Sequence, residues 1–88
     1  MKELFKNYLI NEGYAEYTPK GLQSTVYDYI KRIDFVCETE KMTWIQLSNH
    51  IHQIITDYDI NGIKEHLGNK SHRAVINALK RYKEFLEK

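Results

Sequence analysis

The sequence has little of several features that would assign it to a class at once. It contains one cysteine, Cys37, in 88 residues, which excludes an internal disulfide framework. Cys37 lies among apolar residues, and this setting predicts a buried, inert thiol. No apolar run approaches the length of a membrane-spanning helix, and the N-terminus lacks a signal-peptide pattern. We therefore expect a protein of the cytoplasm with no membrane partner.

Signals for strands and for catalysis are also lacking. No segment alternates apolar and polar residues over the length of a strand, so we expect none. The sequence has no glycine-rich phosphate loop, no nucleophile elbow and no carboxylate pair with a supporting scaffold. These absences predict a non-enzymatic protein without a cofactor or a small-molecule substrate.

What the sequence does contain is helical periodicity. The spacing of apolar residues predicts helices over residues 2–12, 24–40, 44–58 and 71–87, with a short helical turn over 63–67. Gly13 is a natural stop for the first helix, and Thr43 and Ser71 are good N-caps for the third and the last. The only proline, Pro19, lies in the predicted loop after Gly13. We predict one all-α domain over residues 1–88, a small four- to five-helix orthogonal bundle.

Each predicted helix has an apolar face, and together these faces predict the core. Their members recur at intervals of three and four residues, as one side of a helix requires. In chain order they are Leu4, Phe5, Tyr8 and Leu9; Val26, Tyr29, Ile30, Ile33 and Cys37, with Phe35 and Val36 widening this face; Trp44, Leu47, Ile51, Ile54, Ile55 and Tyr58; and Val75, Ala78, Leu79, Tyr82 and Leu86.

Charge is unevenly distributed along the chain although the net charge is only +1. Residues 1–63 contain six Lys or Arg and nine Asp or Glu, whereas residues 64–88 contain seven and three. The last predicted helix thus combines an apolar face with a basic outer face that could contact a polyanion. The alternative is an ordinary solvated face, because surface helices are usually charged. Phosphate contacts are predicted from Lys31, Arg32, Lys70, Arg73, Lys80 and Arg81, and a base-edge contact from Asn77.

Two patterns suggest metal ligands without meeting the full requirement. Residues 57–62 read D-x-D-x-N-G, the opening of an EF-hand loop. Gly68 stands at the twelfth position, where a bidentate Glu should close the site, and Lys64 stands at the eighth. His50 and His52 are two residues apart on a predicted helix and therefore point in different directions. His66 and His72 flank a turn and have no cysteine or carboxylate at ligand spacing beside them. We expect no metal site.

Several segments resemble one family, the phage integrases or tyrosine recombinases. Gly21-Leu22 followed by Thr25-Val26-Tyr27-Asp28-Tyr29 resembles the entry to the second helix of their N-terminal core-binding domain. Met42-Thr43-Trp44-Ile45-Gln46-Leu47 resembles the approach to its third helix. Ala78-Leu79-Lys80-Arg81-Tyr82 with Phe85-Leu86 resembles its final helix. The likeness extends from about Leu4 to Leu86.

The resemblance implies a SAM-like helical fold and a non-catalytic role in clamping double-stranded DNA during phage or mobile-element DNA recombination and integration. Lys80 matches the family's basic residue after Ala-Leu, and Ser71 stands where the family has a capping residue that can also face the DNA backbone. The sequence departs from the family at Ala74, where a basic residue is common. These 88 residues also do not contain the family's catalytic domain.

Two other roles remain open. A protein-interaction module of a phage or mobile-element protein could use Tyr14, Tyr17, Tyr27 and Trp44 as anchors if they are exposed and clustered. A structural helical piece of a larger enzyme would bind nothing by itself. An exposed apolar patch would favour the first of these roles, and a continuous basic groove would favour DNA.

Overall fold

A computed structural model describes all residues from Met1 to Lys88 and contains six helices and no strand. The helices are α1 (Lys2–Asn11), α2 (Thr25–Glu40), α3 (Trp44–Asn49), α4 (Ile51–Tyr58), α5 (Glu65–Gly68) and α6 (Lys70–Leu86). The predicted all-α class is therefore confirmed. None of the helices has both the length and the hydropathy that crossing a membrane would need.

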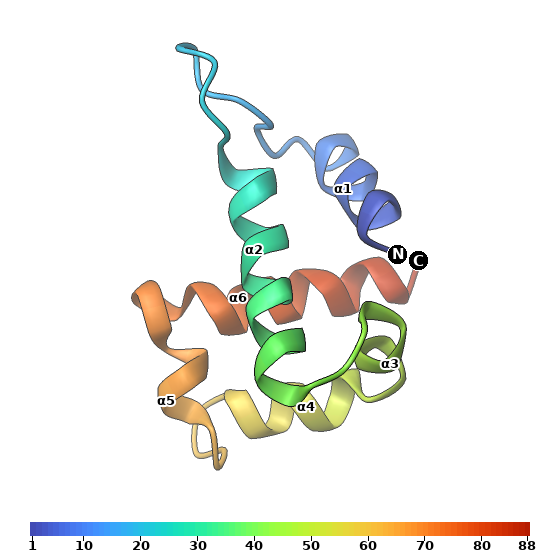
Figure 1. Cartoon of the computed structure of the whole chain (residues 1–88), viewed down its shortest axis with the longest axis vertical. Helices are drawn as coiled ribbons and strands as arrows, with labels where there is room; N and C mark the ends of the chain where they lie inside the picture. Colours follow the sequence, from blue (N-terminus) through green and yellow to red (C-terminus); the bar gives the residue numbers. More distant parts are fainter.

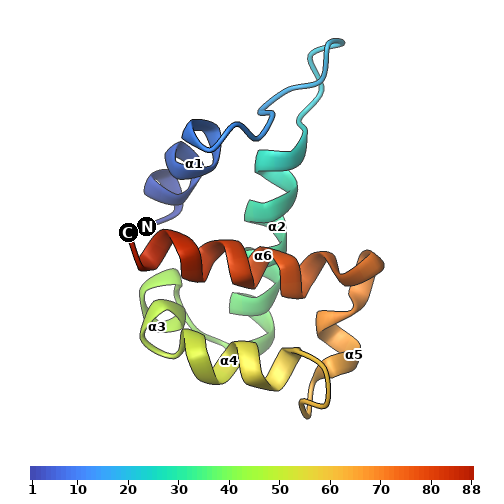
Figure 2. The same ribbon diagram turned by 180° about the vertical axis from the view of Figure 1, so that it is seen from behind.

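Helices α2 and α6 cross at the centre of the bundle (Figures 1 and 2). Helix α1 covers one end of this pair, α3 and α4 lie along the other side, and α5 forms the corner that leads into α6. The core lies between these elements. Its buried residues are Phe5, Leu9, Val26, Ile30, Ile33, Val36, Cys37, Leu47, Ile51, Ile54, Tyr58, Val75, Ile76, Ala78, Leu79 and Tyr82.

Most of the predicted core positions are buried, and Tyr8, Tyr29, Phe35, Trp44, Ile55 and Leu86 are half-buried against the core. Two residues depart clearly from the prediction. Leu4 was expected to face inward but is 59% exposed, because Phe5 and Leu9 alone define the buried side of the short helix α1. Ile76, which the predicted stripe omitted, is fully buried. Cys37 is buried as expected, and its burial raises the pKa of the thiol to about 11.

The predicted helix over residues 44–58 is wrong in one respect, because it divides at His50. Thr43 caps its start with a complete capping box to Gln46, as predicted. Helix α3 then ends at Asn49, and His50 adopts φ −121° before α4 begins. Ser48, Asn49 and His50 are all modest helix formers, so tertiary packing decides the path here. The bend lets Trp44 pack on Phe5 while Tyr58 is buried beneath α2.

The corner between α5 and α6 also differs from prediction. Ser71 does not cap a helix, because Ser71, His72 and Arg73 all have left-handed backbone angles, with φ of 54°, 58° and 67°. The chain must reverse here because Gly68 packs directly on the carbonyl oxygen of Tyr58, where a Cβ atom would not fit. No glycine follows to make the left-handed turn, so three ordinary residues adopt it. The right-handed part of α6 begins only after Arg73.

Residues 12–24 form a protruding arm between α1 and α2 (Figure 1). Gly13, with φ 95°, ends the first helix as predicted. The arm turns tightly at residues 18–21, where the Gly21 amide donates to the carbonyl of Thr18 at 2.9 Å, and a single antiparallel bridge joins Tyr17 to Gln23. The predicted loop is thus a short, ordered hairpin.

The two ends of the chain lie side by side in both views (Figures 1 and 2). The rings of Phe5 and Phe85 have centroids 5.6 Å apart. Lys88 forms an ion pair with Glu12 at 3.5 Å. The C-terminal end of α6 therefore packs along α1.

Candidate nucleic-acid interface

The basic outer face predicted for the last helix is wrong as an open surface, because its cations are paired with acids. Arg73 and Lys80 both contact Asp59, at 3.3 and 3.2 Å. Arg81 contacts Glu84 at 3.2 Å, and Lys83 contacts Glu87 at 3.5 Å. The pairs of Arg81 and Lys83 are local to the helix, whereas those of Arg73 and Lys80 could not be predicted because Asp59 belongs to a separate segment that the fold brings to α6.

Asp59 has a central position among these pairs. It follows α4, and its Oδ1 accepts the backbone N–H of Ile60 at 2.8 Å. That hydrogen bond is the largest cause of a lowered carboxyl pKa; burial opposes it, and the contacts from Lys80 and Arg73 add to the lowering. Asp59 is the only acid in the molecule that pairs with two cations.

Arg81 and Asn77 differ in how available they are to a ligand. The Arg81 guanidinium also donates to the hydroxyl of Tyr14 at 3.4 Å, and its Nε is buried without a partner. This residue therefore fixes the arm to α6 rather than projecting freely. Asn77 is exposed on α6. It lies four positions after Arg73 and three before Lys80, so it falls on the same side of the helix as Lys80.

Five of the 13 Lys and Arg residues form no ion pair, and three of these five are among the predicted DNA contacts. Lys31 and Arg32 lie four and three positions before Phe35 on α2, so all three share one side of the helix. Lys70 reaches the same place from the start of α6, with its Nζ 4.7 Å from the centre of the Phe35 ring. We call Lys31, Arg32, Phe35 and Lys70 the Phe35 patch.

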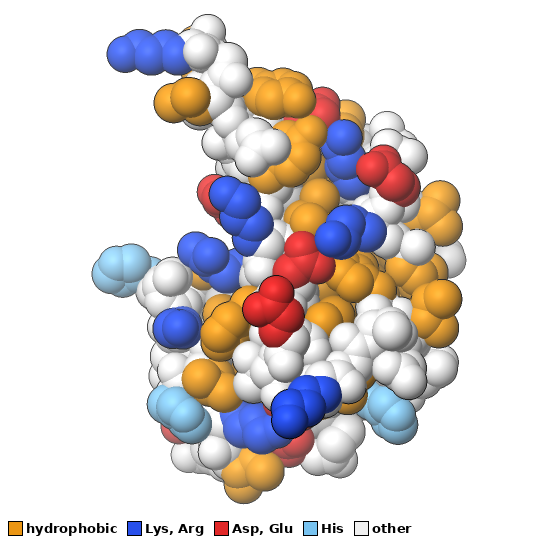
Figure 3. All heavy atoms as spheres, in the orientation of Figure 1, with side chains coloured by type: hydrophobic (Ala, Val, Ile, Leu, Met, Phe, Trp, Pro, Cys, Tyr) orange, Lys and Arg blue, Asp and Glu red, His pale blue; other side chains and the backbone are white.

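The Phe35 patch is small and has acidic neighbours. Lys31 and Lys70 are exposed, and Arg32 is half-buried with a buried Nε that has no hydrogen-bond partner. Asp28 and Glu38, both exposed, flank the patch along α2. Figure 3 shows the same pattern on the α2 side of the molecule, where positive and negative side chains are interspersed. The surface is therefore a local cluster of cations and not a continuous basic groove.

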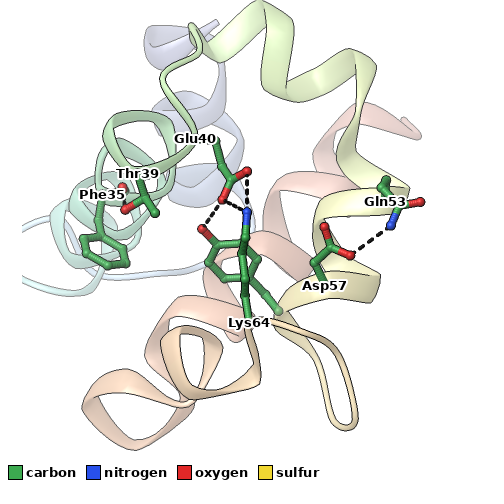
Figure 4. Close-up of polar contacts among 7 residues, drawn as sticks. Phe35, Thr39, Glu40, Gln53, Asp57 and Lys64 are labelled. Carbon is green, nitrogen blue, oxygen red and sulfur yellow. Dashed lines mark hydrogen bonds and ion pairs between the residues drawn. The ribbon is translucent and has the colours of Figure 1, made fainter.

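Lys64 differs from the cations of the Phe35 patch, because its ammonium group is bound to a carboxylate of the bundle (Figure 4). Its Nζ donates to both carboxylate oxygens of Glu40, at 2.9 and 2.7 Å. The hydroxyl of the fully buried Tyr58 donates to the same carboxylate at 2.8 Å. We call these three residues the Glu40 cluster. It ties the end of α2 to the end of α4 and to the loop before α5.

The Glu40 cluster shifts the pKa values of its members. Burial opposes the charged form of Glu40, but the hydrogen bonds from Lys64 and Tyr58 outweigh it and hold the carboxyl pKa below its usual value of 4.5. Burial, with the hydrogen bond to Glu40, raises the pKa of Tyr58. The cluster is thus a charged structural contact with no free ligand position.

The candidate protein anchors are mostly covered. Tyr17 is 52% exposed, but Tyr14, Tyr27 and Trp44 are half-buried. The Trp44 indole N–H donates to Asp34 at 2.8 Å, and the Tyr17 and Tyr27 hydroxyls lie 3.3 Å apart. Of the four, only Tyr17 therefore meets the condition of exposure under which they could act as anchors. The more exposed apolar residues are aliphatic, notably Leu22 at 66%, Ile60 at 61% and Ile63 at 79%.

One hollow of about 480 Å³ opens between α1 and the end of α6. It is lined by Tyr8, Glu12, Glu84, Glu87 and Lys88. Three carboxylates at its wall make it unsuited to a phosphate. Elsewhere, no three His, Cys, Asp or Glu side chains come together in a group that could hold a metal ion. The EF-hand-like segment uses its acids internally, because Asp57 accepts from Gln53 and Asp59 pairs with Arg73 and Lys80.

Comparisons with protein-family models, curated proteins and solved structures found no match for this chain. The resemblance to integrase core-binding domains, with the SAM-like fold and the contact of Ser71 to the DNA backbone that it implies, remains a prediction, although Ser71 does not cap a helix.

Proposed function

We propose that the protein is a small, non-catalytic module that binds double-stranded DNA through phosphate contacts at the Phe35 patch. The supporting observation is that Lys70 lies over the ring of Phe35, one helical turn after Lys31 and Arg32 on α2, and that none of these three cations forms an ion pair. Cations that lie close together and form no ion pair create a region of positive potential, which attracts phosphate. This role agrees with that of the integrase domain that the sequence resembles.

The small size of the Phe35 patch sets the expected strength of binding. Three cations neutralise few phosphates, and the flanking Asp28 and Glu38 reduce the local potential. We therefore expect weak binding that falls steeply with salt, because phosphate contacts act by releasing counterions. Asn77 lies on the exposed side of α6 and is the side chain with the chemistry to read a base edge.

The test is an anisotropy titration of a labelled DNA duplex between about 50 mM and about 200 mM salt. The double variant Lys31→Gln, Lys70→Gln should bind about tenfold more weakly at low salt and lower the slope of log K against log salt by about 2. Lys20→Gln, Lys41→Gln is a matched control, because it removes two other unpaired lysines outside the patch. Equal losses in the two double variants would mean that only net charge matters. No binding by the wild type at low salt would overturn the proposal.

A protein-interaction module is the second candidate, and the aliphatic residues Ile60 and Ile63 favour it. Both are more than half exposed and lie three residues apart in the loop between α4 and α5. Isoleucines exposed to this degree in a short loop suit a protein contact better than a phosphate backbone. Sedimentation of the wild type and of Ile60→Ser, Ile63→Ser tests whether this loop mediates self-association. Association that the double variant abolishes, with no DNA binding, would favour this candidate.

A further inference from the structure

Arg73 and Lys80 on α6 share a single carboxylate, that of Asp59. Asp59 places Oδ1 3.3 Å from a terminal guanidinium nitrogen of Arg73 and Oδ2 3.2 Å from Nζ of Lys80. One oxygen thus contacts each cation, as two non-bridging oxygens of a phosphodiester would. Arg73 has a second anchor, since its other terminal nitrogen donates to Oδ1 of Asn69 at 2.9 Å.

We propose that Arg73 and Lys80 form a second phosphate-binding site for DNA and that Asp59 occupies this site in the free protein. The inference rests on the proposed function, and it adds a site and a residue that limits the affinity of the module. Asp59 competes because it has the charge of one DNA phosphate and is tethered beside the two cations. A tethered competitor is always present at high effective concentration, so the apparent affinity for an external phosphate falls.

The exposure of the three side chains makes exchange feasible. Arg73, Lys80 and Asp59 have side chains that are 38%, 41% and 29% exposed, so a ligand can reach both cations. Ion pairs exposed to this extent contribute little to stability and are screened by salt. A phosphate that displaced Asp59 would therefore cost the fold little. Asn77, between the two cations on α6, would then lie beside the bound backbone.

The negative charge of Asp59 can be removed without losing the hydrogen bond that holds its local turn. Its Oδ1 accepts the backbone N–H of Ile60 at 2.8 Å, and an asparagine Oδ1 can accept the same hydrogen bond. Asp59→Asn therefore removes the negative charge and keeps the local turn. Asp57 is a matched control, because it lies two residues away and accepts only from Gln53 among the side chains. Asp57→Asn makes the same change in net charge without releasing a cation.

The experiment measures duplex binding by wild type, Asp59→Asn, Asp57→Asn and the triple variant Asp59→Asn, Arg73→Gln, Lys80→Gln, each first checked for its thermal midpoint. We expect Asp59→Asn to bind about five- to tenfold more tightly than the wild type at low salt and to steepen the salt dependence by about 2. Asp57→Asn should stay within about twofold of the wild type, and the triple variant should lose the gain.

The outcomes separate this inference from the proposed function. Equal binding by Asp59→Asn and Asp57→Asn, together with a wild type that still requires Lys31 and Lys70, would overturn the inference alone. Retention of the gain in the triple variant would also overturn it, because the gain would not come from Arg73 and Lys80. No binding by any variant at low salt would overturn the proposed function itself.

Discussion

Lys64 and Lys70 are six residues apart in the chain but have opposite environments. Lys64 contacts both oxygens of Glu40 and lies beside the buried Tyr58, whereas Lys70 has no acidic partner and lies over the ring of Phe35. The first lysine belongs to a contact that holds three segments together, and the second belongs to an open surface. A concentration of positive charge in one segment of a sequence therefore does not reveal which of its cations are free to bind a ligand.

The largest effect should come from breaking the Glu40 cluster. Glu40→Ala leaves the Tyr58 hydroxyl and the Lys64 ammonium without their acceptor, and an unsatisfied group in a largely buried position is costly. We expect the free energy of unfolding to fall by about 2 kcal/mol. Urea denaturation followed by circular dichroism measures it. Glu38→Ala, on the exposed side of the same helix, is the control and should change stability by under about 0.5 kcal/mol.

The two lysines can be compared directly by the same substitution. Lys64→Ala should lower the free energy of unfolding by about 1 kcal/mol and leave DNA affinity within about twofold. Lys70→Ala should do the reverse, with a loss of DNA affinity of about threefold or more and a stability change near that of a weak cation–π contact, about 0.5 kcal/mol. Urea denaturation and duplex titration of both variants measure the two quantities. Similar behaviour of the two variants would contradict the distinction drawn between them.

The left-handed turn that follows Lys70 can be tested by a substitution at its middle residue, His72. His72 is exposed and has φ 58°, which glycine adopts without steric cost. His72→Gly should therefore raise the free energy of unfolding by about 0.5 kcal/mol or slightly more. Asn77→Gly, five residues further into the right-handed helix, should lower it by up to about 1 kcal/mol. Thermal midpoints measure both, and a loss of stability in His72→Gly would contradict the left-handed assignment.

The smallest effect concerns pH. The pKa of Glu40 is lower in the folded protein than its usual value of 4.5, so its charged form stabilises the fold above that value. As the pH falls through the folded-state pKa, Glu40 takes up a proton and this contribution is lost. The stability difference between wild type and Glu40→Gln should therefore narrow from neutral pH to about pH 3. Urea midpoints at both pH values check it, and a difference that widens on acidification would have the wrong sign.

Local patterns predicted much of the fold because helices are specified by neighbouring residues. The stop at Gly13, the cap at Thr43 and the start of α2 near Ser24 all follow from residues within one turn of the boundary. The bend at His50 was not predictable in this way. It depends on where Trp44 and Tyr58 pack, and both make contacts far away in the sequence. The left-handed turn after Lys70 likewise depends on the contact between Gly68 and Tyr58.

The candidate site was predictable only in part for the same reason. The positions of the cations are evident from the sequence. Whether each cation is free to bind a ligand depends on acids from other segments, such as Asp59 beside α6 and Glu40 beside Lys64. The unpaired cations Lys31 and Arg32 lie within residues 1–63, where acidic residues outnumber basic ones. The distribution of charge along the chain therefore did not indicate a basic surface there. A sequence signal did exist for the Phe35 patch, since two adjacent cations precede an aromatic residue by one helical turn on α2.

The neighbouring ends of the chain have a consequence for topology. Because Met1 and Lys88 are close, a short peptide could connect them, and the molecule could be reopened within the arm at residues 18–21 with every helix retained. Such a permuted chain would begin and end at the tip of the arm. The same adjacency would allow the bundle to be inserted into a surface loop of another protein with little separation of the loop's two anchor points.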